Sequence, residues 1–271
     1  MKESNEYILG THPDELHRLG IQHQVWASEA QTGWANAGFT AGHHLLDLGS
    51  GPGFCSRELA YIVGSEGTVV AVDQSQNYIK EVNHLSEKYQ LPLRGVCSTF
   101  EDLELEPNTL DGVYCRWALA WIKNPQAIID KIARWLKPGG NFIAHEYFHW
   151  MTHSTVPEYS NLNIAIKAAF DSFESFGGTI NVGRQIPEMA VKCGLSVELV
   201  RPMAKMAQPK DFTWQWPGSF YKVYFPKLVE DGFLDPDFAQ KALAEFEALS
   251  SNPNSMLHCP LVAEIIVTKP N

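Results

Sequence analysis

Three glycines at every second position follow an acidic residue in the segment from Leu45 to Phe54, Leu-Leu-Asp-Leu-Gly-Ser-Gly-Pro-Gly-Phe. This apolar run predicts a strand that leads into a tight loop, and the helical spacing of the residues after Gly53 predicts a helix next. Glycine has no Cβ and adopts positive φ easily, so a ligand can approach such a loop closely. Taken alone, the motif is compatible with several nucleotide-type cofactors.

Two acidic side chains narrow the choice of cofactor. Asp73 ends the next apolar run, 20 residues after Gly53, and an acid at this place in a βαβ unit can accept hydrogen bonds from a ribose. Asp47 precedes the loop, where it would repel a pyrophosphate but attract an ammonium or sulfonium group. Pro52 also removes a backbone donor that a phosphate would use. The pattern favours a nucleoside with a cationic tail and no phosphate.

Strand and helix patterns alternate through the first half of the chain. Apolar runs bounded by turn residues predict strands, and segments with helical spacing separate them. Such alternation predicts a parallel sheet with helices on both faces. Strands are predicted at residues 45–48, 68–72, 93–97, 110–115 and 141–146, and helices at 12–31, 54–63, 75–89 and 125–136.

The alternation ends after residue 146. Two further strands are predicted at residues 195–200 and 262–268, and the gap between them is too long for a plain loop. We therefore predict an α/β, Rossmann-like fold with a seven-stranded, mostly parallel sheet, a terminal antiparallel hairpin and a helical lid built from inserts. The additional helices are predicted at residues 155–176, 183–192, 218–230 and 236–249.

These patterns divide the chain into a core and its additions. We assign a helical cap (1–41), a cofactor-binding core (42–146), a helical insert (147–182), two segments that complete the core sheet (183–203 and 259–271) and a second helical insert (204–258).

The composition excludes several partners. The 271 residues carry a net charge of −10 without a block of Lys or Arg, whereas nucleic-acid binding depends on a basic face. No stretch has the roughly 18 apolar residues of a membrane span, and the N-terminus lacks the apolar run of a signal peptide. The five cysteines are scattered without a CxxC pair, which indicates reduced thiols. We expect a cytoplasmic protein that binds neither nucleic acid nor membrane.

Three motifs in register resemble those of class I S-adenosylmethionine-dependent methyltransferases. They are the loop at residues 47–53, the strand Val-Val-Ala-Val-Asp at 69–73 and the turn Leu-Lys-Pro-Gly-Gly at 136–140. The resemblance covers about residues 42–146, and it is greatest to the branch that includes ubiquinone and menaquinone C-methyltransferases. It implies S-adenosylmethionine as the cofactor and a small-molecule methyl acceptor.

The resemblance also implies roles for individual residues. Those implied for the methionine portion of the cofactor are Asp47, Gly49, Ser50, Gly51, Gly53, Arg116, Trp117 and Ala118. Those implied for the ribose and the adenine are Asp73, Gln74, Thr99, Phe100 and Glu101. Two N-terminal residues resemble ones that fold over the cofactor in related proteins, Tyr7 and Gln22. Thr99 departs from the family pattern, which usually has an aspartate there.

Acid–base chemistry is predicted at the end of the fifth strand. Glu146 or His149 could act as a general base that deprotonates the acceptor. The competing interpretation is that both are polar strand-end residues whose hydrogen bonds go to the backbone. His145, His149 and His153 would align as metal ligands on a helix, but His145 lies in a predicted strand, so we expect no metal. Methyl transfer from a sulfonium is an in-line displacement, and holding the acceptor within reach could suffice without a base.

The two inserts are rich in aromatic residues, which either line an apolar pocket or form the core of the lid itself. If some line a pocket that excludes water, the acceptor is a small apolar or aromatic molecule. These residues are Tyr147, Phe148, Trp150, Tyr159, Phe170, Phe173 and Phe176 in the first insert, and Phe212, Trp214, Trp216, Phe220, Tyr221, Tyr224 and Phe225 in the second.

The sequence thus predicts a methyltransferase that acts on the O, N or C of a small molecule. An NAD(P)-dependent oxidoreductase is the first alternative, and Asp47 and Pro52 disfavour it. The second alternative is a non-catalytic protein of the same fold that senses the cofactor.

Overall fold

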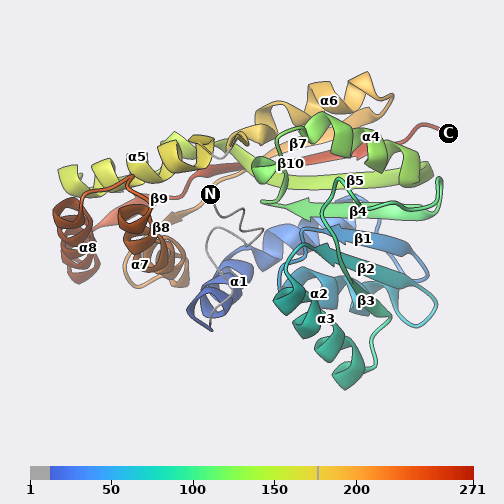
Figure 1. Cartoon of the computed structure of the whole chain (residues 1–271), viewed down its shortest axis with the longest axis horizontal. Helices are drawn as coiled ribbons and strands as arrows, with labels where there is room; N and C mark the ends of the chain where they lie inside the picture. The colour runs from blue at the N-terminus through green and yellow to red at the C-terminus, as the bar shows by residue number, and fades with distance from the viewer. Residues whose placement is uncertain (1–12, 176) are drawn as a thin grey trace.

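The computed structural model describes residues 13–175 and 177–271. Its centre is a seven-stranded sheet in the order β3-β2-β1-β4-β5-β10-β7 (Figure 1). Only β10 runs antiparallel to its neighbours, which are β5 and β7, so the predicted Rossmann-like sheet is confirmed. The strands are β1 (His44–Leu48), β2 (Thr68–Asp73), β3 (Leu93–Cys97), β4 (Leu110–Arg116), β5 (Leu136–His149), β7 (Ser196–Met203) and β10 (Leu261–Thr268).

Helices cover both faces of this sheet (Figure 1). One face is covered by α1 (Pro13–Asn36), α2 (Phe54–Val63) and α3 (Gln76–Tyr89), and the other by α4 (Pro125–Trp135) and α6 (Ile186–Lys192). Successive residues of a strand point to opposite faces: Leu46 and Leu48 join the core cluster under α4 and α6, and Leu45 joins the cluster under α2. None of the helices in the described ranges is long and apolar enough to cross a membrane.

Side-chain caps fix where several helices begin. The Ser75 hydroxyl accepts a hydrogen bond from the Tyr78 amide at the start of α3. Asn124 caps α4 through the Ala127 amide, and Asp235 caps α8 (Pro236–Ser251) through the Asp237 amide. Each cap satisfies an amide that has no partner within its helix.

The inserts gather at the end of the sheet toward which β4 points (Figure 1). They contain α5 (Ser160–Ser175), α7 (Gln215–Glu230), α8 and a small antiparallel sheet in the order β6-β9-β8. The strands of this sheet are β6 (Ser154–Val156), β8 (Met206–Ala207) and β9 (Met256–His258). Single-turn 3₁₀ segments lie at Leu119–Trp121 (η1), Trp150–Thr152 (η2), Val182–Arg184 (η3) and Phe212–Trp214 (η4).

Two predicted helices are shorter than expected. The helix predicted to begin at residue 155 begins at Ser160, because residues 154–156 pair with β9 instead. Val156 is β-branched and precedes a proline, and both features favour extended backbone. The helix predicted at residues 183–192 is divided into η3 and α6.

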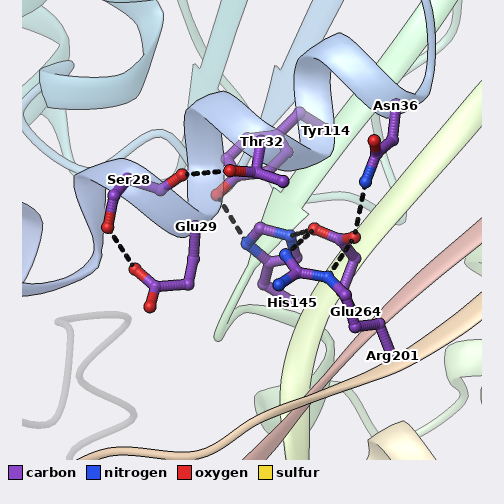
Figure 2. Close-up of polar contacts among 8 residues, drawn as sticks. All are labelled: Ser28, Glu29, Thr32, Asn36, Tyr114, His145, Arg201 and Glu264. Atoms are coloured by element: carbon purple, nitrogen blue, oxygen red, sulfur yellow. Dashed lines mark hydrogen bonds and ion pairs between the residues drawn. The ribbon is translucent and has the colours of Figure 1, made fainter.

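A chain of buried polar side chains crosses four adjacent strands beneath α1 (Figure 2). Glu264 on β10 lies opposite both His145 on β5 and Arg201 on β7. Its Oε2 lies 3.0 Å from His145 Nε2, and Arg201 Nε donates to its Oε1 at 3.0 Å. The Tyr114 hydroxyl on β4 lies 3.2 Å from His145 Nδ1. Cross-strand register therefore places one carboxylate between a histidine and an arginine.

The polar side chains of this row differ in charge. Burial opposes ionisation of Glu264, but the hydrogen bonds from His145 and Arg201 outweigh it and lower the pKa of Glu264 to about 2. Burial also lowers the pKa of His145, which keeps the imidazole neutral. Arg201 is therefore the counter-charge of Glu264. Helix α1 packs so closely on this carboxylate that a Cβ at Gly33 would lie 2.5 Å from Glu264 Oε2.

Replacing Glu264 with glutamine should weaken the fold most at neutral pH. A depressed carboxyl pKa stabilises the folded state above the unfolded value of 4.5, and this stabilisation is lost as the pH falls toward about 2. We expect Glu264→Gln to lower the free energy of unfolding by about 3 kcal/mol at pH 7 and by much less near pH 3. Urea unfolding at several pH values measures this difference.

The control is Asp171→Asn, which removes one partner of an exposed ion pair with Lys167 on α5. It should change the free energy of unfolding by less than about 1 kcal/mol at every pH. A cost for Glu264→Gln that stays constant from pH 7 to pH 3 would contradict the assigned ionisation.

Candidate active site

A cavity of about 320 Å³ lies at the carboxyl ends of the parallel strands, where open α/β sheets bind their ligands. It is bordered by the loops after β1, β2, β3, β4 and β5 and by side chains of α1, α5 and α7. The structure brings most of the predicted cofactor residues together in its wall: Gln22, Asp47, Gly49, Ser50, Gly51, Asp73, Gln74, Thr99, Phe100, Glu101, Arg116, Trp117 and Ala118.

Three other predicted residues do not line this cavity. Gly53 lies behind the loop at the start of α2, where it has a φ of 87° and a Cβ would lie 2.9 Å from Val82 Cγ2. Glu146 is fully buried beneath the cavity wall, and His149 is exposed. Tyr7 and Phe176 lie outside the described residues.

The glycine loop is shaped by contacts with β2 and with the loop after β4. The amides of Gly49 and Ser50 both donate to the Val72 carbonyl at 2.9 Å. Gly49 has a φ of 80°, and a Cβ on it would lie 2.4 Å from the Cβ of Ala118. Only glycine is compatible with both the backbone conformation and this approach. The first glycine of the motif thus serves chain packing as well as ligand access.

Asp73 both holds the loop and faces the cavity. Its Oδ2 accepts a hydrogen bond from the Gly51 amide at 3.0 Å, and its Oδ1 accepts one from the Ser75 amide at 2.8 Å. Burial raises the pKa of Asp73, although both amides favour the charged form. Each carboxylate oxygen has a second lone pair. Asp73 can therefore still accept hydrogen bonds from a diol such as a ribose.

Asp47 is the other acid in the cavity wall. Its side chain is buried, and its Oδ2 accepts a 2.5 Å hydrogen bond from the Ser56 hydroxyl on α2. Burial raises the pKa of Asp47 to about 6, although Ser56 and Arg116 favour the charged form. A buried carboxylate with one hydrogen-bond donor attracts a cation strongly, because little water screens it.

The loop after β4 is held in a strained conformation. Trp117 has a φ of 52°, which is uncommon for a bulky residue. Glu146 secures the next turn, since its Oε1 accepts hydrogen bonds from the amides of Ala118 at 2.9 Å and Leu119 at 2.8 Å. Burial raises the pKa of Glu146 to about 7 despite these bonds. Glu146 thus shapes the cavity wall without reaching into the cavity.

The three histidines spaced by four residues lie in three different places. His145 is in the buried polar chain, His149 is exposed at the end of β5, and His153 lies beside a second, smaller cavity. Residues 13–175 and 177–271 contain no group of three His, Cys, Asp or Glu placed to hold a metal ion.

Aromatic rings form the end of the cavity remote from the glycine loop. Trp117 stacks on Tyr147 at a centroid distance of 5.7 Å and on Trp216 at 5.6 Å. Trp150 packs edge-on against Tyr147 at 5.1 Å and against Phe173 at 5.3 Å. Among the aromatic residues predicted for a pocket, the inserts place Tyr147, Trp150, Phe173 and Phe220 in the wall. Others form the core of the lid, for example Trp214, Tyr224 and Phe225.

Helix α1 contributes Arg18 and Gln22 to the wall. Arg18 was not predicted as a site residue, and Gln22 was predicted as a residue that folds over the cofactor. Gln22 Oε1 accepts hydrogen bonds from Arg18 at 3.0 Å and from the Trp216 indole at 3.1 Å, so it connects α1 to α7. Arg18 also pairs with Glu15 at 2.7 Å. The spacing of these three residues, three and four apart, places them on one helical face. That spacing is the sequence signal from which Arg18 could have been found.

The structure combines a Rossmann-like sheet with a cavity at the carboxyl ends of its parallel strands. Residues 46–144 match the family model described as a methyltransferase domain. The predicted resemblance to class I S-adenosylmethionine-dependent methyltransferases is therefore confirmed over this segment.

Individual relatives agree with this family. The chain is 32% identical over 114 residues to phosphoethanolamine N-methyltransferase 1 of Triticum aestivum, a match that covers 40% of the chain and 22% of the wheat protein. It is 33% identical over 100 residues to the ubiquinone biosynthesis O-methyltransferase of Coxiella burnetii, covering 36% of the chain and 41% of that protein. Both matches span less than half of the relative's own length.

A solved structure supports the fold over most of the chain. The YcgJ protein of Bacillus subtilis has a TM-score of 0.60 and 15% identity to this chain, and the match covers 92% of this chain and 99% of YcgJ. At this low identity the likeness concerns the fold alone.

Replacing Glu146 should change the stability of the fold according to whether the new side chain can accept a hydrogen bond. Glu146→Leu leaves the buried Ala118 and Leu119 amides without an acceptor, so the free energy of unfolding should fall by about 3 kcal/mol. Glu146→Gln keeps an acceptor oxygen and should not lower it. Urea unfolding at pH 7 compares the two variants.

The pH dependence gives a second readout. A raised carboxyl pKa costs stability as the pH rises from the unfolded value of 4.5 through about 7. Glu146→Gln, which cannot ionise, should therefore gain stability relative to the wild type over that interval. Equal losses for the two substitutions would refute the role assigned to Glu146 Oε1.

Proposed function

We propose that this protein transfers a methyl group from S-adenosylmethionine to a small, apolar or aromatic acceptor by in-line displacement. The proposal rests on the difference in polarity between the two ends of the cavity. The buried Asp47 and the half-buried Asp73 lie at the glycine-loop end, and aromatic rings enclose the other end.

The glycine-loop end fits the proposed cofactor. S-adenosylmethionine supplies a methyl group on a sulfonium. Asp73 and Asp47 line this end, where Asp73 would accept hydrogen bonds from its ribose and Asp47 would attract its ammonium group. Gln74, Thr99 and Phe100 border the same end and would surround the adenine. The Thr99 hydroxyl donates to Asp102 at 2.8 Å, which turns it toward its own loop and leaves backbone groups for the adenine.

The aromatic end favours an uncharged acceptor. Within the described wall of this cavity, the acidic residues are Asp47 near the end of β1, Asp73 at the end of β2 and Glu101 in the loop after β3. A cationic amine would therefore find no carboxylate among the rings. The ring of Trp117 is already covered by Tyr147, Trp216 and the Arg116 guanidinium, so it offers little open face for a cation–π contact.

A non-catalytic, cofactor-sensing protein is the second candidate. It is favoured by the positions of Glu146 and His149, because neither predicted base lines the cavity. Methyl transfer can proceed by positioning alone, so these positions do not decide between the two candidates. Detection of a methylated product from a panel of small apolar acceptors would favour the enzyme.

Asp73 provides the first test of the cofactor assignment. Asp73→Asn keeps one acceptor for the loop amides but removes the charge that a ribose diol would contact. We expect its affinity for S-adenosylmethionine in titration calorimetry to fall about 100-fold. Asp73→Ala should also lower the free energy of unfolding, because the Gly51 and Ser75 amides lose their acceptor.

The matched control is Asp130→Asn, an exposed acid on α4, which should bind S-adenosylmethionine as the wild type does. NAD is the competing ligand in the same experiment. Binding of NAD without binding of S-adenosylmethionine would overturn the proposed function in favour of an oxidoreductase.

Asp47 should make cofactor binding dependent on pH. Its pKa of about 6 means that the carboxyl attracts a cation above pH 6 and progressively loses this charge below it. The affinity of the wild type for S-adenosylmethionine should fall about fivefold between pH 6 and pH 5. Asp47→Asn should bind weakly at both values, with little change between them. Calorimetry from pH 7.5 to pH 5 measures both slopes, and parallel slopes would contradict the role of Asp47.

A further inference from the structure

A second cavity adjoins the aromatic end of the first. Its volume is about 30 Å³, which is room for water-sized groups rather than a whole ligand. Arg18, Gln22, Tyr147, Trp150 and Phe220 line both cavities, so these side chains form the partition between them. Beyond the partition the small cavity is bordered by His153, which follows η2, and by Tyr221 on α7. The pair therefore lies one layer of side chains away from the aromatic end.

His153 and Tyr221 are hydrogen-bonded in a defined order. His153 Nδ1 lies 2.5 Å from the backbone carbonyl of His258 on β9. A carbonyl can only accept, so Nδ1 carries the ring proton and Nε2 has the free lone pair. Nε2 contacts the Tyr221 hydroxyl, which therefore donates to it. The Tyr221 oxygen retains lone pairs that can accept a proton from another group.

The surroundings keep the imidazole neutral and available. Among the described residues that line either cavity, His153 is the only histidine. Burial lowers the pKa of His153 to about 4, although the hydrogen bond to the His258 carbonyl favours the charged form. The titratable groups that face the pair are Tyr147 on β5, Arg18 on α1, His258 on β9 and Cys259 after β9.

We propose that Tyr221 and His153 form the proton-accepting pair of the site, and that the methyl acceptor is an uncharged apolar molecule with an ionisable hydroxyl, such as a phenol or an enol. The inference rests on the proposed methyl transfer and deepens it. It assigns the base to neither Glu146 nor His149. In this arrangement the Tyr221 hydroxyl contacts the acceptor, and His153 Nε2 contacts the Tyr221 hydroxyl.

The step balances without a further reactant. The acceptor oxygen forms a bond to the methyl carbon as the carbon–sulfur bond breaks, and the electron pair of that bond stays on sulfur. The hydroxyl proton passes to the Tyr221 oxygen, and the Tyr221 proton passes to His153 Nε2. The products are a methyl ether, a neutral thioether and an imidazolium, so the positive charge moves from the sulfonium to His153.

The test compares two phenols of different acidity as probes. 2-Naphthol is un-ionised at pH 8 and needs a base, whereas 4-nitrophenol is already a phenolate and does not. For 2-naphthol, we expect Tyr221→Phe and His153→Gln each to lower kcat by about 100-fold with little change in KM. For 4-nitrophenol, both variants should keep kcat within about threefold of the wild type. A purely structural role would lower both rates together.

The matched control is Tyr224→Phe. Tyr224 is also buried on α7, but its hydroxyl contacts Ser172 at 2.8 Å and it lines neither cavity. Tyr224→Phe should therefore methylate both probes at the rate of the wild type. Calorimetry with S-adenosylmethionine accompanies each variant, so that loss of the cofactor site is seen separately.

Each outcome supports or overturns a specific claim. Equal losses for both phenols in Tyr221→Phe and His153→Gln would overturn the proton-accepting role. If the wild type binds S-adenosylmethionine but methylates neither probe, the assignment of a hydroxyl acceptor is overturned. If the wild type does not bind S-adenosylmethionine, the proposed function itself fails.

Discussion

The site depends on the close approach of two loops, those that follow β1 and β4. Gly49 and Ala118 come so near that a Cβ on Gly49 would lie 2.4 Å from that of Ala118. The approach is maintained from below, where a buried Glu146 oxygen accepts two amide hydrogen bonds from the β4 loop. It places Trp117, with its left-handed backbone, where the acid-lined end of the cavity meets the aromatic end. The strain at Trp117 is thus compensated by hydrogen bonds that satisfy otherwise buried amides.

Features that depend on local sequence could be predicted. The apolar run of β1 and the spacing of Asp73 after Gly53 follow from short-range rules, and Asp73 lies in the cavity wall at the end of β2. The caps at Ser75 and Asp235 involve amides only two or three residues away, so they too can be read locally. Parallel strands bring such positions to one edge of the sheet, which is why the cofactor end of the candidate site was accessible from the sequence.

Features that depend on distant partners could not be predicted. Glu146 was a plausible base, but its partners are amides 27 and 28 residues away on another loop, and no local pattern encodes that pairing. His153 was considered only as a possible metal ligand, because of its spacing from other histidines. Its partners, the His258 carbonyl and Tyr221, come from the second insert. The three residues of β6 are too few to show a period, and they form a strand only because β9 lies beside them.

Charge balance explains why the two ends of the cavity differ. Transfer of a methyl group from a sulfonium to a neutral hydroxyl leaves one positive charge, because the hydroxyl proton must go somewhere. In an enclosed aromatic pocket this proton cannot pass easily to water, and an unpaired charge there is costly. Asp47 and Asp73 are engaged with Ser56, Gly51 and Ser75 at the far end, and Glu146 is engaged with the β4 loop. In the proposed reaction the neutral imidazole of His153, fixed in one tautomer by a backbone carbonyl, would accept this proton at the aromatic end.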